Sequence, residues 1–144
     1  MKKIASRFGD IEYDPANTLL FPEGLIGFET LRQFVVMPNE KEGPLFWIQS
    51  VEDSQMAFVL TDPTHFYYDY KVVPDGRERE KLGIGEDDDC HVVTVVTVPP
   101  DHNITLNLAA PILFAPQTNR ALQVILEGTQ FSPQTPLPQL ENAS

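Results

Sequence analysis

The sequence predicts an all-β protein, a small antiparallel β-barrel-like domain with one short helix. Thirteen prolines are spread along the chain, and proline interrupts helices because it removes a backbone donor and clashes with the preceding turn. Between the prolines, apolar residues recur at every second position, which is the period of a β-strand. Many short strands joined by frequent turn residues favour an antiparallel barrel or sandwich.

Several segments have the composition of strands. In chain order, the first candidates are 8–13, 18–21, 33–37 and 45–51. Apolar side chains then alternate in 56–60, 104–108 and 122–126, so each of these strands turns one face to the core. The run 92–98 is rich in β-branched residues and apolar on both faces, as expected of a strand that is covered on both sides.

Residues 76–83 depart from the strand pattern. They are rich in Glu, Arg and Lys, which are good helix formers. Asp75 can cap the start of a helix, and Gly83 can end it in a left-handed conformation. The sequence therefore predicts one short helix at this point.

The chain predicts a single domain with a short tail. Its 144 residues, 42% of them apolar, suffice for one hydrophobic core and are too few for two ordinary domains. From Ser132 onward, prolines alternate with polar residues, and too little apolar surface remains to offset the entropy of ordering. We therefore expect a domain over residues 1–131 and a flexible Pro-rich tail over 132–144.

Charge and targeting signals limit the classes of partner. The net charge of −11 disfavours direct binding to nucleic acid or to an anionic membrane, and it fits a basic protein partner better. The single cysteine excludes an internal disulfide, and the first residues lack the apolar core of a signal peptide. The longest uncharged stretch, 103–119, is interrupted by prolines and is no membrane span. These features predict a cytoplasmic protein.

The residue patterns predict no catalytic residue, cofactor or metal ion, and hence no enzyme. Cys90 and His91 are neighbours on a strand and point to opposite faces, so they make a poor nucleophile and base pair. His65 and His102 lie beside prolines and fit surface loops. One cysteine and three dispersed histidines do not make a zinc site. The acidic run 86–89 lacks the ligand spacing of a calcium loop.

Two segments are candidates for binding. Residues 75–89 hold seven acidic and three basic side chains, which form either a solvated surface or a docking patch for a basic protein. The candidate contacts there are Glu78, Glu80, Glu86, Asp87, Asp88 and Asp89. The apolar segment 109–116 is framed by prolines and is either a core strand or an edge strand that accepts a partner segment. Its candidate contacts are Ile112, Leu113 and Phe114.

Five pieces of sequence, in order along nearly the whole chain, resemble the flagellar assembly factor FliW family. They are FPEGLIGFE at 21–29, WIQS at 47–50, AFVLTDP at 57–63, NLAAPI at 107–112 and QVIL at 123–126. No single piece is specific, because glycine turns and Asp-Pro pairs are common. Their order and separations carry the resemblance.

The resemblance implies a small antiparallel β-barrel-like fold and a function that motif chemistry does not reveal. Members of the family antagonise the regulator CsrA, a small dimeric RNA-binding protein that represses flagellin translation, and they also bind flagellin. The resemblance supplies these partners, and the negative charge of the segment 75–89 makes it the candidate contact for the CsrA-type regulator. The apolar residues 112–114 are the candidate contact for flagellin.

A small-ligand-binding β-barrel module is the alternative function. In that case Trp47, Phe58 and Tyr68 would line an interior pocket. A barrel interior packed with aliphatic side chains, as the run 92–98 suggests, would leave no room for such a ligand.

Overall fold

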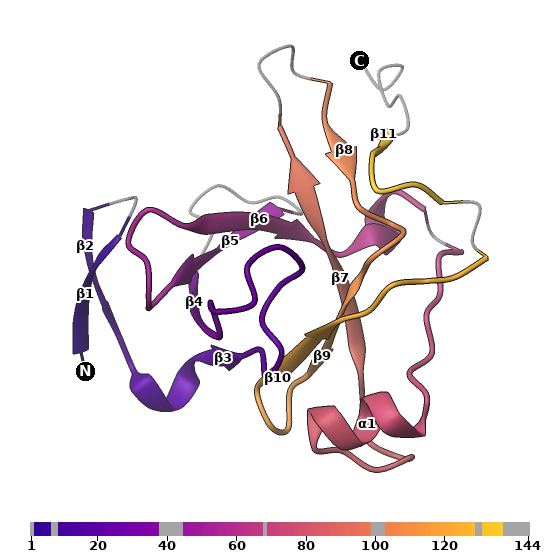
Figure 1. Cartoon of the computed structure of the whole chain (residues 1–144), viewed down its shortest axis with the longest axis horizontal. Helices are drawn as coiled ribbons and strands as arrows, with labels where there is room; N and C mark the ends of the chain where they lie inside the picture. The colour runs from indigo at the N-terminus through magenta and orange to yellow at the C-terminus, as the bar shows by residue number, and fades with distance from the viewer. Residues whose placement is uncertain are drawn as a thin grey trace.

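Seven strands form a closed barrel in the computed structural model, which describes residues 2–6, 9–37, 45–67, 69–98, 103–128 and 131–136 (Figure 1). The ring closes because β7 pairs with β9 as well as with β6, and every pairing in the ring is antiparallel except β10 with β3. In order around the ring, the strands are β3 (Leu19–Leu20), β4 (Gln33–Met37), β5 (Leu45–Ser50), β6 (Ala57–Thr61), β7 (His91–Thr97), β9 (Ile112–Ala115) and β10 (Arg120–Gln123).

The remaining elements lie outside this ring. They are the hairpin of β1 (Lys2–Ser6) and β2 (Gly9–Tyr13), the 3-10 turns η1 (Pro15–Asn17) and η2 (Pro63–His65), the helix α1 (Gly76–Leu82), and the strands β8 (Thr105–Leu106) and β11 (Thr135–Pro136). The all-β prediction is confirmed, and each predicted strand segment overlaps a strand, although the segment 122–126 shares only Leu122 and Gln123 with β10. The strand β1 was not predicted, because its sequence has no apolar alternation. Its extended conformation depends on pairing with β2.

The barrel interior is packed with the side chains that the period-two pattern placed on one face. Phe58 and Leu60 of β6 belong to this core, together with Val93 and Val95 of β7. Phe34 lies at its centre, with its ring centroid 5.2 Å from that of Phe21. The alternate residues of β7, which face out of the barrel, pack under α1 and the chain around Tyr70, so this strand is covered on both faces as predicted.

The helix α1 covers the outer face of β9 and β10. Leu82 packs there against Leu113 and Leu122 in a second cluster of buried side chains. Asp75 and Glu78 form a reciprocal capping box at its start, and Gly83 ends it with a φ of 74°. The predicted helix is therefore confirmed with its predicted cap. None of the helices in the described ranges is long and apolar enough to cross a membrane.

The predicted tail begins inside the sheet. Thr135 and Pro136 form β11, which pairs with β8, so pairing extends past the predicted boundary at residue 131. Residues 137–144 lie outside the described part of the chain. The division into a domain and a tail stays a prediction.

Gly24 gives a test of the segment 21–31, which folds back onto the barrel core. Its φ is 70°, and a Cβ there would lie 2.6 Å from the Cα of Glu29. Gly27 has a φ of 87° but open space around it. We expect Gly27→Ala to cost about 1–2 kcal/mol in unfolding free energy, from its left-handed backbone alone. Gly24→Ala should cost more, because the backbone of Glu29 must also move. Equal losses in urea unfolding of the two variants would contradict the close approach.

Candidate functional site

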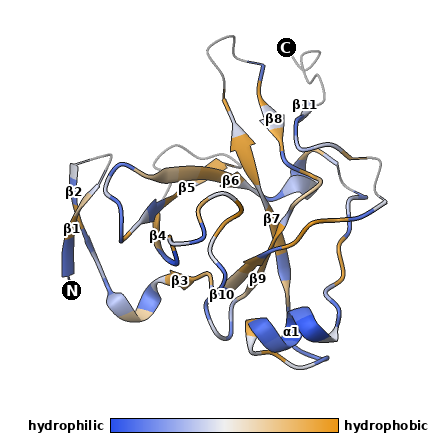
Figure 2. Cartoon of the chain, in the orientation of Figure 1, coloured by the Kyte–Doolittle hydropathy of each residue, from blue (hydrophilic) through white to orange (hydrophobic). Residues whose placement is uncertain are grey.

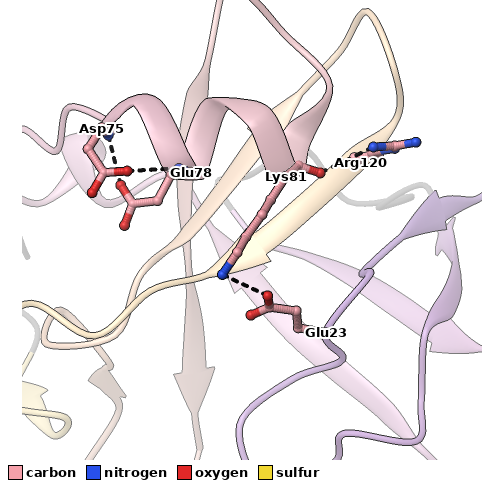
Figure 3. A network of polar contacts seen from close by, with 5 residues as sticks. All are labelled: Glu23, Asp75, Glu78, Lys81 and Arg120. Carbon is pink, nitrogen blue, oxygen red and sulfur yellow. Dashed lines mark hydrogen bonds and ion pairs between the residues drawn. The ribbon is translucent and has the colours of Figure 1, made fainter.

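The acidic segment forms a lobe on the outside of the barrel, made of α1 and the turn that follows it. We refer to residues 75–89 as the acidic lobe; Figure 2 shows α1 as one of the most hydrophilic elements of the fold. Three contacts hold the lobe to the barrel. Lys81 Nζ lies 2.7 Å from Glu23 Oε2, Arg120 donates to the Lys81 carbonyl at 3.3 Å (Figure 3), and the Thr118 hydroxyl donates to the Leu82 carbonyl at 2.7 Å.

Two of the six predicted acidic contacts, Glu78 and Asp88, accept hydrogen bonds from backbone N–H groups within the lobe. Glu78 accepts from the Asp75 N–H at 2.9 Å in the capping box (Figure 3). Asp88 accepts from the Gly85 N–H at 2.8 Å and fixes the turn, while Arg79 donates to the carbonyls of Gly85 and Asp88. Their carboxylates hold the backbone of the lobe in shape.

The other four predicted residues carry available carboxylates. They are Glu80, Glu86, Asp87 and Asp89, all of them exposed. No hydrogen bond or ion pair engages their side chains within the part of the chain that the structure describes. The lobe therefore presents four acidic groups to solvent on a fixed backbone.

Within the apolar segment 109–116, β9 is an interior strand, so the interpretation as a core strand is confirmed and the interpretation as an edge strand is wrong. β9 pairs with β10 on one side and with β7 on the other. Its prolines do not interrupt it, because Pro111 precedes the strand and Pro116 follows it. Ile112 is 1% exposed inside the barrel, and Leu113 is 0% exposed under α1. Of the three candidate flagellin contacts, Phe114 alone is partly exposed.

Phe114 also lines an apolar cavity of about 190 Å³ in the barrel. All the residues that line it are apolar: Leu19, Phe21, Val36, Phe46, Leu60, Val93, Ile112, Phe114 and Ala121. Trp47 and Phe58 are not among them, and Tyr68 lies outside the described residues. Ligand sites combine apolar walls with a few polar groups that orient the ligand. The cavity leaves room for a small apolar group, but its walls provide no such anchor.

Cys90 and His91 do not form a reactive pair. The Cys90 thiol is half-buried beside the lobe and lies 3.9 Å from the backbone carbonyl of His91. Burial raises the pKa of the thiol, which lowers its nucleophilicity near neutral pH. The His91 ring stacks on Phe114 instead, with centroids 6.5 Å apart. His65 is exposed in η2, and His102 lies outside the described residues. Among the described residues, no three His, Cys, Asp or Glu side chains gather in a metal-binding cluster.

A cleft that was not predicted from the sequence runs beside the end of β10. Ile26, Glu29 and Ile125 line its larger part, of about 420 Å³, together with Glu23, Gly24 and Gln123. The Gly27 N–H donates to Glu29 at 3.0 Å and lowers the pKa of that carboxyl. One signal was available: Val124 and Leu126 alternate toward the core, so Ile125 between them had to face outward, and it is 69% exposed.

Comparison with known proteins gives consistent matches over nearly the whole chain. The family model described as FliW protein matches residues 2–137. The chain is 69% identical over 137 residues to the flagellar assembly factor FliW of Syntrophotalea carbinolica, covering 95% of this chain and 98% of that protein. It is 61% identical to flagellar assembly factor FliW 2 of Desulfotalea psychrophila, covering 96% and 91%. A crystal structure of the flagellar assembly factor FliW matches with a TM-score of 0.86 at 30% identity, covering 96% and 99%.

The burial of β9 predicts a large effect of Leu113→Ala. Truncating a fully buried leucine leaves a cavity and costs about 2–5 kcal/mol. The matched control is Ile125→Ala, because that side chain is largely exposed and its loss should cost about 0.5 kcal/mol or less. Urea unfolding followed by fluorescence measures both. Similar midpoints for the two variants would mean that Leu113 is not in the core.

Proposed function

Because the chain belongs to the FliW family of flagellar assembly factors, we propose that it acts in the bacterial cytoplasm as a binding switch for two proteins. One partner is a CsrA-type RNA-binding regulator, which this protein antagonises. The other is flagellin. When flagellin occupies the protein, the regulator is free to repress flagellin synthesis, and export of flagellin releases the protein to bind the regulator. It binds no nucleic acid directly and carries no catalytic role.

The acidic lobe is the observation that carries the proposal for the regulator. A protein that binds RNA carries basic surface for the phosphates, and the lobe offers four carboxylates that have no partner among the described residues. Since these side chains are exposed, they remain hydrated until a partner arrives and act mainly at long range. Such charges raise the association rate more than the affinity, and salt screens them. The net charge of −11 adds to the attraction.

The flagellin contact needs apolar surface on this protein, because the amphipathic segments of flagellin must be bound before flagellin is assembled. Ile112 and Leu113 are buried and support such a contact only by positioning β9. Phe114 is the partly exposed member of the predicted trio, and it lines the barrel cavity together with Val36, which is 44% exposed. We place the apolar contact at Phe114 and Val36.

Neutralising the available carboxylates tests the regulator contact. We expect replacement of Glu80, Glu86, Asp87 and Asp89 by Gln or Asn to slow association with a CsrA-type regulator and to weaken its salt dependence. Stopped-flow mixing over a series of salt concentrations measures both. Unfolding should change little, since surface substitutions usually stay within about 0.5 kcal/mol each.

The matched control removes the same number of negative charges elsewhere, at Asp10, Glu12, Asp69 and Glu127, all exposed and outside the lobe. This variant should keep most of the association rate. If both variants lose the same amount, only net charge matters and the lobe is a solvated surface.

The switch predicts reciprocal antagonism between the two partners. Linkage requires that flagellin weakens regulator binding by the same factor by which the regulator weakens flagellin binding. Titrating flagellin into the preformed complex with the regulator should release the regulator and restore its repression of a flagellin leader RNA. A stable ternary complex in size-exclusion chromatography, with the regulator still inhibited, would contradict the switch and leave two independent binding activities.

A further inference from the structure

The edge of β10 is left open where β3 leaves it. The two strands pair at a single position, Arg120 with Leu20. The N–H of the next residue, Phe21, donates to the carbonyl of Arg32 instead, at 2.7 Å. Beyond Arg120, no strand of the described residues therefore pairs with β10 on the side that β3 occupied.

On its other side, the chain after β10 keeps the hydrogen-bonding pattern of a strand, although the strand itself ends at Gln123. The N–H of Val124 donates to the Pro111 carbonyl at 2.9 Å, and that of Leu126 donates to the Ala109 carbonyl at 2.8 Å. Successive residues of a strand direct their backbone groups to opposite sides, so those of Gln123 and Ile125 face away from β9. Over the described residues, no backbone hydrogen bond reaches them there. The N–H of Ile26 bonds only to the side chain of Gln123, at 2.8 Å.

A cleft lies along this open edge. Its larger part, of about 420 Å³, is bounded by the segment 23–29, and a second part of about 290 Å³ is bounded by α1. Glu23, Gln123 and Ile125 line both parts, so the two parts adjoin at the open edge. Figure 3 shows Glu23 and α1 facing each other across the Lys81 ion pair.

The walls of the cleft combine exposed apolar groups with carboxylates. Ile26 is 48% exposed and Ile125 is 69% exposed, although both are large aliphatic side chains. The acidic groups outnumber the basic ones: Glu23, Glu29, Asp75 and Glu78 against Arg77 and Lys81. Lys81 already pairs with Glu23. The cleft therefore favours an occupant that carries both apolar and positively charged side chains.

We propose that residues 123–125 form a strand-addition site for an extended segment of a partner protein, one that alternates apolar and basic side chains. The open backbone groups of Gln123 and Ile125 supply the hydrogen bonds of the added strand. Because side chains alternate along a strand, its apolar residues meet Ile26 and Ile125 while its basic residues meet the acidic walls. The site contains none of the four available carboxylates of the lobe and none of the candidate contacts in β9, although Glu78 of the lobe lines its wall. It does not depend on which protein carries the segment.

A second copy of this chain fits the edge less well. Two copies would bring their acidic walls together, and each carries a net charge of −11, so like charges oppose the pairing. A dimer through this edge is an outcome that the test must separate from peptide binding.

A pair of synthetic peptides tests the proposal on the full chain. The probe is a short capped peptide that alternates lysine and valine, titrated into isotopically labelled protein and followed by amide NMR shifts. The control peptide has the same sequence with N-methyl groups on alternate residues, which keep the charge and remove the strand hydrogen bonds. We expect shifts at Ile26, Gln123 and Ile125 with the probe, and at least about tenfold weaker binding of the control.

A variant of the protein tests the same edge. Ile125→Pro removes the open N–H and leaves the bonds of Val124 and Leu126 to the β9 side intact, and proline is tolerated on edge strands. Ile125→Pro should weaken binding of the probe peptide by about tenfold or more. Ile125→Thr keeps the N–H and should weaken that binding less. If Ile125→Pro does not fold, the two peptides on the wild-type protein still decide the question.

Four results would overturn the proposal. Equal binding of the two peptides, or shifts confined to residues of the acidic lobe that do not line the cleft, would show charge attraction without strand addition. The absence of shifts at saturating probe would show that the edge does not accept such a segment. A concentration-dependent dimer in sedimentation velocity that Ile125→Pro abolishes would assign the edge to a second copy of the chain. None of these results depends on the regulator or on flagellin, so failure here is distinct from failure of the proposed switch.

Discussion

The pairing of β7 is the constraint on which the other features depend. One edge of this strand pairs with β6, and the other edge pairs first with β9, through Val93, and then with β8, from Val96. The division closes the barrel with β9 and carries the sheet onward through β8. It also gives β9 a neighbouring strand at each edge, so that Ile112 faces the barrel interior and Leu113 faces α1 on the other side of the same strand.

Local patterns were sufficient to predict the strands and the helix, because they depend on residues close together in the sequence. Alternation in 56–60 and 122–126 identified the core-facing side chains, and Asp75 with Gly83 marked the ends of α1. The same local patterns could not predict that the ring of strands closes. Closure depends on pairing 91–93 with 112–114, and apolar alternation identifies the buried face of a strand but not which strand lies beside it. The edge interpretation of 109–116 failed for this reason.

The candidate sites divide in the same way. Composition predicted that the acidic segment would be exposed, and this is confirmed. Composition does not show that the carboxylates of Glu78 and Asp88 accept hydrogen bonds from backbone N–H groups. That distinction comes from the turn geometry at Gly85 and the capping box. The cleft beside β10 was missed because its walls come from three segments, 23–29, 75–81 and 122–125, that no sequence pattern connects.

Glu23 links two surfaces that have so far been described separately. Its carboxylate lines the cleft, and it is also the partner that holds Lys81 of the acidic lobe at 2.7 Å. A single carboxylate in contact with two ammonium groups brings those two positive charges close to each other, and their repulsion loosens one of the contacts. A cation that enters the cleft at Glu23 therefore competes with Lys81 for the same oxygen atoms. The released lysine would then offset part of the negative field that the lobe presents to solvent. Occupation of the cleft by a cation and the negative potential of the lobe are therefore coupled through Glu23.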